Sequence, residues 1–290
     1  MVRRQLLEDD AVTIHFHANV MNLRAREALA SLASKALKLG LAVVEDGTKA
    51  DIMIALGGDG TILRAVRSHP ALPVLGFNLG SLGYLATVGD SEFDSALESI
   101  ANGDYKLSGR AMLEAHHADN PGKSFLALNE VVVMREMTGH AAAIDLEADG
   151  KHVTRYLADG LVIATPTGST AYSLAAGGPI LMPDSASLAV TPMNPHALGV
   201  RPLVVSDSVC LRVTSRRRVN GRAEKIGVYA DGESVFMLDG DESAVITLSS
   251  QRARFVELKG YDPYGVLGRK LGWCGVNKEW ESRQEDGDGH

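Results

Sequence analysis

Apolar runs that end in glycine alternate with helical segments over the first part of the chain, and this alternation restricts the possible fold more than any other feature. DIMIALGGDG at 51–60 and LPVLGFNLGSLGYLA at 72–86 each read as a buried strand followed by a glycine loop. The segments 24–39 and 91–103 have apolar residues near a 3.6-residue period and glycine at or just after their ends. Strands that alternate with helices are joined by right-handed crossovers and form a parallel, doubly wound sheet. The sequence therefore predicts an α/β domain over residues 1–105.

Residues 106–258 have a different pattern. Short β-type stretches such as FLALNEVVVMRE and RPLVVSDSVCLRVTS are separated by Gly, Asp and Ser turns. This spacing is typical of an antiparallel β-sandwich, so we expect an all-β C-terminal domain here. The remaining segment, 259–290, ends in an acidic stretch, and we expect it to be a tail that returns to the N-terminal domain.

Composition excludes several classes of partner. The 290 residues carry a formal net charge of −7, and a field of that sign repels a nucleic-acid backbone. No apolar run reaches the roughly 18 residues that a bilayer span needs, and the N-terminus has acids where a signal peptide has apolar residues. The two cysteines, Cys210 and Cys274, have no CxxC spacing and are expected to be reduced. We therefore expect a cytoplasmic protein with no nucleic-acid partner and no membrane partner.

The first glycine loop combines a phosphate-binding pattern with a carboxylate. Gly57, Gly58 and Gly60 lie between a buried strand and the helix expected to start at Thr61, where backbone N–H groups and the helix dipole favour an anion. Asp59 repels phosphate in such a loop unless it contacts a hydroxyl proton or a metal, which indicates chemistry. The alternative is a tight turn in which Asp59 only caps the helix. No Gly-Lys-Ser/Thr follows, so the loop is not a Walker motif.

Three further features favour a ligand site. A second glycine loop, GFNLGSLGYLA, follows the next strand, and open α/β sheets bind ligands at that edge. The segment 159–173 gathers short polar side chains and one tyrosine, which suits a sugar or nucleotide, although a capped helix with serine-rich turns would use one or two of the hydroxyls. Asn129 and Glu130, at the head of an apolar strand, are either a ligand contact or an ordinary surface pair.

These motifs together resemble the NAD kinase family. They occur in the family's order, as LGGDGT at 56–61, Asn129-Glu130, DGLVIATPTGSTAYSLAAGGPILMP at 159–183, PHALGVRPLVV at 195–205 and LGW at 271–273. GGDGT is shared with diacylglycerol-type lipid kinases, but the TPTGSTAYSLAAGG block is not expected in them. The resemblance implies a NAD kinase/diacylglycerol kinase-like fold, with an α/β N-terminal domain and an all-β sandwich C-terminal domain.

The resemblance also implies an activity, which is transfer of a phosphoryl group to the 2′-hydroxyl of the adenosine ribose of NAD to give NADP. ATP is the implied donor, with polyphosphate as an alternative, and Mg²⁺ or another divalent metal is the implied cofactor. The implied assembly is a homodimer or homotetramer. Two alternatives stay open: a lipid or sphingoid kinase that shares the GGDGT loop, and a non-catalytic nucleotide sensor.

Site residues are carried over by motif. Asp59 resembles the family's proton acceptor, the catalytic residue, and the phosphate- and ATP-binding turn comprises Gly57, Gly58, Gly60 and Thr61. The predicted NAD-binding residues are Asp59, Gly60, Tyr84, Asn129, Glu130, His140, Leu157, Asp159, Thr170, Ala171, Tyr172, Ser173, Leu174, Ala175 and Glu233. No metal ligand is assigned.

Three positions depart from the family pattern. Leu79 stands where Arg or Thr is more common, Leu157 where a basic residue is common, and Glu233 where Gln is frequent. Arg155 or His140 is our hypothesis for the source of the missing positive charge.

Other conspicuous side chains are interpreted as structural. His15 and His17 share one face of a strand without a further ligand nearby in sequence, which favours a structural pair over a metal site. His116 and His117 point to opposite faces and make a poor ligand pair. The arginines at 216–218 are expected at a solvated hairpin tip.

Overall fold

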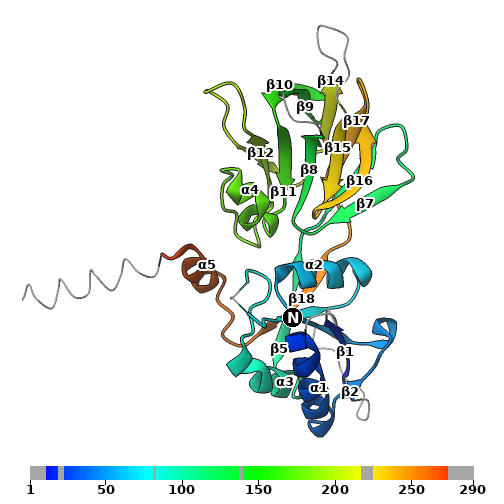
Figure 1. Ribbon diagram of the computed structural model, residues 1–290, viewed down its shortest axis with the longest axis vertical. Helices are drawn as coiled ribbons and strands as arrows, with labels where there is room; N and C mark the ends of the chain where they lie inside the picture. The colour runs from blue at the N-terminus through cyan, green and yellow to red at the C-terminus, as the bar shows by residue number, and fades with distance from the viewer. Residues whose placement is uncertain (1–10, 19–22, 81–82, 137–139, 217–224, 274–290) are drawn as a thin grey trace, which may run out of the picture. The chain divides into compact units, whose positions relative to one another are not determined.

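The computed structural model describes residues 11–18, 23–80, 83–136, 140–216 and 225–273 (Figure 1). The chain divides into two compact units, of which the first comprises Met1–Ser108 with Arg254–His290 and the second comprises Gly109–Ala253. The first unit is α/β and the second is all-β sandwich apart from one short helical segment, so the predicted fold class is confirmed.

A six-stranded sheet forms the centre of the first unit. Its strand order is β2-β1-β3-β4-β18-β5, with the bounds Ala42–Val43 for β2, Thr13–Ala18 for β1, Ile52–Leu56 for β3, Val74–Phe77 for β4, Ala253–Leu258 for β18 and Tyr105–Arg110 for β5. The pairs β1–β2, β1–β3, β3–β4 and β4–β18 are parallel. The apolar runs before the glycine loops are β3 and β4, which are buried along their whole length.

Helices cover both faces of this sheet. α1 (Leu23–Lys38) and α3 (Phe93–Ala101) pack together over one face and share its core cluster. α2 (Asp59–Ser68) lies over the opposite face (Figure 1). On β4, Leu75 and Phe77 face the cluster shared by α1 and α3, so Gly76 between them faces the other way. Ile62 of α2 fills the space beside Gly76. The sheet is therefore doubly wound, as the alternation of strands and helices predicts.

The other described helical segments of the first unit are η1 (Gly47–Lys49), η2 (Asp90–Glu92) and α5 (Pro263–Leu271). Asp262 caps α5 by accepting the backbone N–H of Tyr264, and the helix ends at Gly272 with a left-handed backbone.

Two six-stranded sheets form the second unit. One has the order β10-β9-β14-β17-β6-β7, with β10 at Lys151–Ala158, β9 at Ala142–Ala148, β14 at Leu211–Arg216, β17 at Ser243–Leu248, β6 at Leu113–His117 and β7 at Ser124–Ala127. The other has the order β13-β12-β11-β8-β15-β16, with β13 at Leu203–Ser206, β12 at Ser187–Met193, β11 at Gly160–Ala164, β8 at Glu130–Arg135, β15 at Ile226–Ala230 and β16 at Glu233–Leu238. Side chains from both sheets, such as Ile144 and Ile163, join one buried cluster, which makes the unit a sandwich. A helical segment of η3 (Gly168–Thr170) and α4 (Tyr172–Ala175) follows β11.

The predicted domain boundaries differ from this division at two strands. The predicted boundary at 105/106 cuts β5, which lies in the sheet of the first unit. The prediction also places residues up to 258 in the sandwich, whereas β18 pairs in parallel with β4 and its residues from Arg254 onward belong to the first unit. α5 belongs to the first unit as well. Residues 274–290, which include Cys274, lie outside the described residues.

Two further observations concern the cysteines and membrane-spanning helices. Cys210 is exposed and is a free thiol. In the part of the chain that the structure describes, no helix is long and apolar enough to cross a bilayer.

Candidate active site

The first glycine loop joins β3 to α2 by a backbone that only glycine adopts readily. Gly57 has φ +151°, and a Cβ there would lie 2.4 Å from Thr61 Oγ1. Gly58 and Gly60 are exposed, and a Cβ at either would meet no atom of the described residues within 4 Å. Backbone groups of this turn are therefore open to a ligand at a helix N-terminus, as a phosphate turn requires.

The start of α2 tests the alternative that Asp59 only caps this helix. α2 begins at Asp59, two positions before the predicted start at Thr61, and its N-cap is Gly58. The side chain of Asp59 does not cap this helix, so the interpretation of Asp59 as a capping residue is wrong. Thr61, predicted to bind phosphate, has its side chain packed beside Gly57 and is only 7% exposed.

Asp59 instead binds the second glycine loop. Its Oδ2 accepts the backbone N–H of Tyr84 at 2.9 Å, and its Oδ1 accepts those of Leu85 and Ala86 at 3.0 Å each. A carboxylate has about four lone-pair positions, so these bonds leave one on Oδ2 for a further donor. The two glycine loops that the sequence analysis placed at one sheet edge are thus joined through this single carboxylate.

Gly83 makes this junction possible. A Cβ at Gly83 would lie 2.0 Å from Asp59 Oδ1, closer than any real contact. Tyr84 follows it with a partly exposed ring, and burial together with the charge of Asp59 raises the pKa of its hydroxyl. Lys270 of α5 places its Nζ 5.6 Å from the centre of the Tyr84 ring, a cation–π contact that sequence analysis missed.

In the second unit, Asn129 and Glu130 stand at the start of β8 and are each only 7% exposed. They are therefore not an ordinary surface pair. Among the described residues, Asn129 Oδ1, Glu130 Oε2 and Thr167 Oγ1 are buried without a hydrogen-bond partner. Buried polar atoms usually have partners, so each of these atoms is a place where a ligand can supply one.

The charge state of Glu130 is shifted by its surroundings. Burial, with a further contribution from the carboxylate of Asp231, raises its pKa to about 7, while the backbone N–H of Tyr172 opposes this shift. Near neutral pH the Glu130 carboxyl is therefore able both to accept and to donate a hydrogen bond.

The TPTGSTAYS segment, by contrast, uses most of its hydroxyls internally. Thr165 Oγ1 donates to Leu128 O at 2.6 Å, Ser169 Oγ to Pro166 O at 2.7 Å, and Thr170 Oγ1 to Thr167 O at 3.2 Å. The Oγ of Ser173 lies 2.9 Å from Thr191 Oγ1. Most of these hydroxyls therefore stabilise the conformation of the segment. Their number alone, which the sequence analysis took to favour a sugar or nucleotide, is not evidence for a ligand.

Close packing holds this segment against β8. A Cβ at Gly168 would lie 2.0 Å from Asn129 O, which only glycine avoids. Among the other predicted NAD-binding residues of the segment, Ala171 and Leu174 are partly exposed, Ala175 is exposed, and Tyr172 is 41% exposed. The Tyr172 ring is thus available for stacking on a planar ligand.

Asp159 is already paired within the unit. Its Oδ1 lies 2.6 Å from Arg135 Nη2, and its Oδ2 accepts a hydrogen bond from the side-chain amide of Asn194 at 2.9 Å. These contacts, led by the Asn194 hydrogen bond, lower the pKa of Asp159.

Arg155 and His140, the residues suggested as sources of the missing positive charge, lie in different surroundings. Arg155 binds the buried Asp145 through two bonds of 2.5 and 2.9 Å, so its guanidinium already has a partner within the second unit. Of the remaining predicted contacts, His140, Leu157 and Glu233 are exposed.

The histidines interpreted as structural have protein contacts. His15 Nδ1 lies 3.1 Å from Val44 O, and burial, followed by the proximity of His15, lowers the pKa of His17. Arg216 pairs with the buried Asp145 at 2.6 Å, whereas residues 217 and 218 lie outside the described residues.

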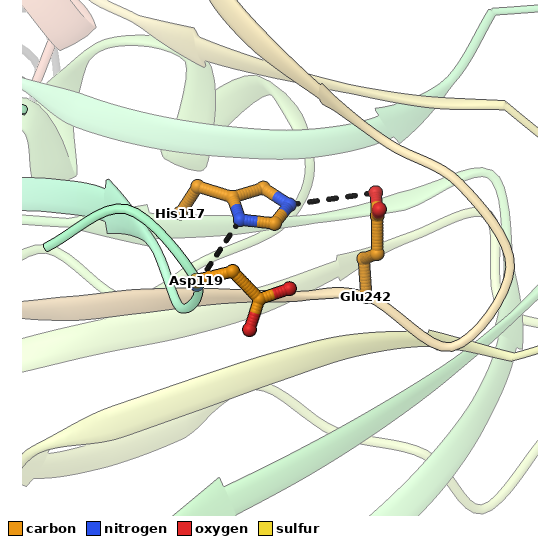
Figure 2. Close-up of side chains that lie close together, drawn as sticks. All are labelled: His117, Asp119 and Glu242. Atoms are coloured by element: carbon orange, nitrogen blue, oxygen red, sulfur yellow. Dashed lines mark hydrogen bonds and ion pairs between the residues drawn. The ribbon is translucent and has the colours of Figure 1, made fainter.

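Among the described residues, one group of three possible metal ligands gathers, and it lies in the second unit. Figure 2 shows His117 between Asp119 and Glu242. Both ring nitrogens have partners: Nδ1 accepts the backbone N–H of Asp119 at 3.2 Å, and Nε2 lies 3.4 Å from Glu242 Oε2. These bonds fix the tautomer with hydrogen on Nε2, which leaves neither nitrogen free to bind a metal.

Solved structures define the class of the fold. Yeast NADH kinase complexed with NADH superimposes with a TM-score of 0.81 at 24% identity, covering 91% of this chain and 88% of that chain. An NAD kinase from Archaeoglobus fulgidus in complex with ATP gives a TM-score of 0.70 at 24% identity, covering 86% of this chain and 94% of that chain. The fold is therefore that of the two-domain kinases with an α/β unit and a β-sandwich.

The family follows from the sequence matches. The model of the ATP-NAD kinase N-terminal domain matches residues 7–105, and that of the C-terminal domain matches residues 128–258. The NAD kinase of Syntrophotalea carbinolica is 38% identical over 77% of this chain and 78% of its own length. The NAD kinase of Chlorobium limicola is 36% identical over 86% of this chain and 87% of its own length. The chain belongs to the NAD kinase family, and neither the lipid kinase nor the non-catalytic sensor finds support.

Proposed function

We propose that this protein transfers the γ-phosphoryl group of ATP to the 2′-hydroxyl of the adenosine ribose of NAD, giving NADP, and that Asp59 accepts the hydroxyl proton. The observation that supports this most is the fixed carboxylate of Asp59 beside an exposed glycine turn at a helix N-terminus. Family membership supplies the substrate pair.

The proposed roles in the first unit follow from the local geometry. The backbone of Gly57, Gly58 and Gly60 binds the triphosphate, and the helix dipole of α2 favours its negative charge. The three backbone bonds to the second glycine loop hold Asp59 in one orientation, so no reorganisation is needed when the ribose hydroxyl loses its proton. Tyr84, on the same loop, contacts the nicotinamide end.

A divalent metal, which we propose to be Mg²⁺, would neutralise charge on the transferred phosphoryl group. Asp59 is the only carboxylate in the LGGDGT turn, and most of its lone pairs are used. Mg²⁺ is commonly held by substrate phosphates, waters and one or two carboxylates, so this donor set fits a metal that arrives mainly with ATP.

In the second unit, we propose that the buried acceptors of Asn129 and Glu130 bind hydroxyl and amino groups of the NAD adenosine, and that Tyr172 stacks on a ring of the substrate. The proposed surface is lined by the partly or fully exposed Thr170, Ala171, Leu174 and Ala175. Ser173 is buried and would support it from beneath through its contact with Thr191. Asp159, His140, Leu157 and Glu233 are proposed at its margin, where Asp159 remains paired with Arg135.

The activity is tested with purified protein, Mg²⁺, and NAD or NADH, with ATP or polyphosphate added in turn. NADP formation is followed with a NADP-specific dehydrogenase. We expect formation with ATP and NAD that depends on the metal and stops when EDTA is added. Absence of NADP with every donor would contradict the proposal.

We further propose that the protein works in the cytoplasm as a homodimer or homotetramer, in keeping with the family resemblance. Light scattering coupled to size-exclusion chromatography measures the assembly, and a monomer at assay concentration would contradict this part.

A further inference from the structure

The sequence Ala-Asp-Gly turns two hairpins of the second unit. Asp149 and Gly150 connect β9 to β10 with φ of 50° and 72°, and Asp231 and Gly232 connect β15 to β16 with φ of 47° and 82°. Two-residue hairpins of this kind need positive φ at both positions, which Asp and Gly supply. The requirements of the turn are therefore the same in both places.

The two aspartates differ in what their carboxylates bind. Asp149 accepts one backbone N–H, from Cys210 at 2.9 Å. Asp231 accepts three consecutive ones: Oδ2 binds Leu128 N at 2.8 Å, while Oδ1 binds Asn129 N at 2.8 Å and Glu130 N at 3.2 Å. The backbone N–H of each aspartate also donates, from Asp231 to Glu130 O at 3.0 Å and from Asp149 to Cys210 O at 2.9 Å. The two turns therefore differ in their side-chain bonds, and turn formation does not require the additional ones made by Asp231.

The segment that Asp231 binds is also held from a second direction. Thr165 donates its backbone N–H to Asn129 O at 2.9 Å and its hydroxyl to Leu128 O. The peptide groups around Asn129 and Glu130 are thus fixed by two separate elements, while one side-chain oxygen of each residue, Asn129 Oδ1 and Glu130 Oε2, stays buried without a partner among the described residues. An arrangement that fixes the backbone and leaves the acceptors unsatisfied is organised for a ligand in advance.

We propose that Asp231 is a positioning residue for substrate binding, which fixes the Asn129–Glu130 backbone so that Asn129 Oδ1 and Glu130 Oε2 are presented to NAD without rearrangement. This inference rests on the proposed NAD kinase function. Asp231 acts through these two residues, and the phosphoryl transfer step itself does not involve it.

The test compares Asp231→Asn and Asp231→Ala with Asp149→Asn and Asp149→Ala, which alter the same turn elsewhere in the same unit. Steady-state kinetics give KM for NAD and kcat, and thermal unfolding reports stability. Asn keeps one acceptor oxygen at Oδ1, whereas Ala keeps none. We expect KM for NAD to rise about 10-fold or more in Asp231→Ala and by a smaller factor in Asp231→Asn, with kcat within about 3-fold of the parent. Both Asp149 variants should keep the parent KM.

A second readout separates positioning from loss of structure and applies even where Asp231→Ala folds poorly. Asp231 is the charged group that acts on the Glu130 carboxyl, and removing its charge allows that carboxyl to ionise at lower pH. The midpoint of the pH dependence of KM for NAD should therefore move to lower pH in Asp231→Asn and stay unchanged in Asp149→Asn.

The outcomes are distinct. If Asp231→Asn keeps both the parent KM and the parent midpoint, or if Asp231 and Asp149 variants change alike, Asp231 is only a turn residue. If the parent protein forms no NADP, the proposed function itself has failed.

Discussion

At the level of single residues, Asp59 combines two tasks, because its carboxylate both joins two glycine loops and is proposed to accept the ribose proton. Asp59→Asn largely separates them, since its single amide oxygen at Oδ1 can still accept the N–H groups of Leu85 and Ala86, although the bond from Tyr84 to Oδ2 is lost, and an amide is a very poor base. We expect kcat to fall by about 10²–10⁴, which corresponds to roughly 3–5 kcal/mol of barrier, while the fold remains intact.

Steady-state NADP formation and thermal unfolding measure these two effects. Asp46→Asn is the matched control, because Asp46 also accepts a backbone N–H in the first unit, from Thr48 at 2.9 Å, and lies outside the glycine loops. NADP formation at the parent rate in Asp59→Asn would remove the proton-acceptor assignment.

Glu130 makes a different contribution, because the folded protein raises its pKa from 4.5 to about 7. A raised pKa means that ionisation opposes folding, so this site lowers the free energy of unfolding progressively from about pH 4.5 to about pH 7. Glu130→Gln removes the effect. We expect the variant to gain up to about 3 kcal/mol relative to the parent between about pH 4 and pH 8, measured by urea unfolding. A difference in stability that does not vary with pH would show that Glu130 titrates normally.

Some of the candidate site residues could be predicted from the sequence, and others could not. The GGDGT pattern pointed to Asp59, and the residue pair at the head of an apolar strand pointed to Asn129 and Glu130. It gave no sign of Asp231 or Lys270, because their roles depend on contacts between segments far apart in the chain. Nothing local distinguishes the Asp231 turn from the Asp149 turn.

At the level of elements, the second glycine loop needs glycine at Gly83 because its backbone lies against the Asp59 side chain. A side chain at Gly83 would collide with Asp59, whereas among the described residues a Cβ at Gly80, on the same loop, would meet nothing closer than Asn78 Oδ1 at 4.0 Å. We therefore expect Gly83→Ala to displace the loop, lower stability by about 1–3 kcal/mol and reduce kcat.

Gly80→Ala serves as the control and should change stability by less than about 0.5 kcal/mol. Urea unfolding and steady-state kinetics provide the measurements. Equal effects of the two substitutions would indicate that the loop tolerates displacement and that its contact with Asp59 is unimportant.

The elements themselves were largely predictable where their periodicity is strong. α1, α3, β3 and β4 lie where apolar spacing and glycine stops place them, because each buries one face or its whole length. The start of α2 was placed two residues late, since a helix that begins with Asp-Gly has a poor local signal and is held by the contacts of Asp59 with another loop.

At the level of the whole molecule, one buried carboxylate contributes to the acid stability of the sandwich. Asp145 is bound by Arg155 and Arg216, and these hydrogen bonds, led by the one from Arg155, lower its pKa from 3.8 to about 2. A lowered pKa contributes stability that is present above about pH 4 and is lost as the pH falls towards 2. The contribution amounts to about 2 kcal/mol.

Asp145→Asn should therefore be less stable than the parent at about pH 6, and the difference should shrink as the pH falls from about 4 to about 2. Urea unfolding over this range measures the gap. A gap that stays constant down to pH 2 would mean that the two arginines do not hold Asp145 ionised.

The domain boundary was the least predictable feature. The stretch ARFVEL at Ala253–Leu258 alternates like any sandwich strand, and no residue in it specifies a parallel partner in the first sheet. Only the completed structure shows that this strand lies between β4 and β5.

That position has a consequence for biosynthesis. A ribosome releases β4 and β5 early, then the entire sandwich, and only afterwards the strand that belongs between them. Throughout that interval the nascent α/β layer carries two unpaired strand edges, which are the usual starting points for aggregation. The sandwich can mature while the chain is still being made, whereas the α/β layer is completed only after the sandwich has been synthesised.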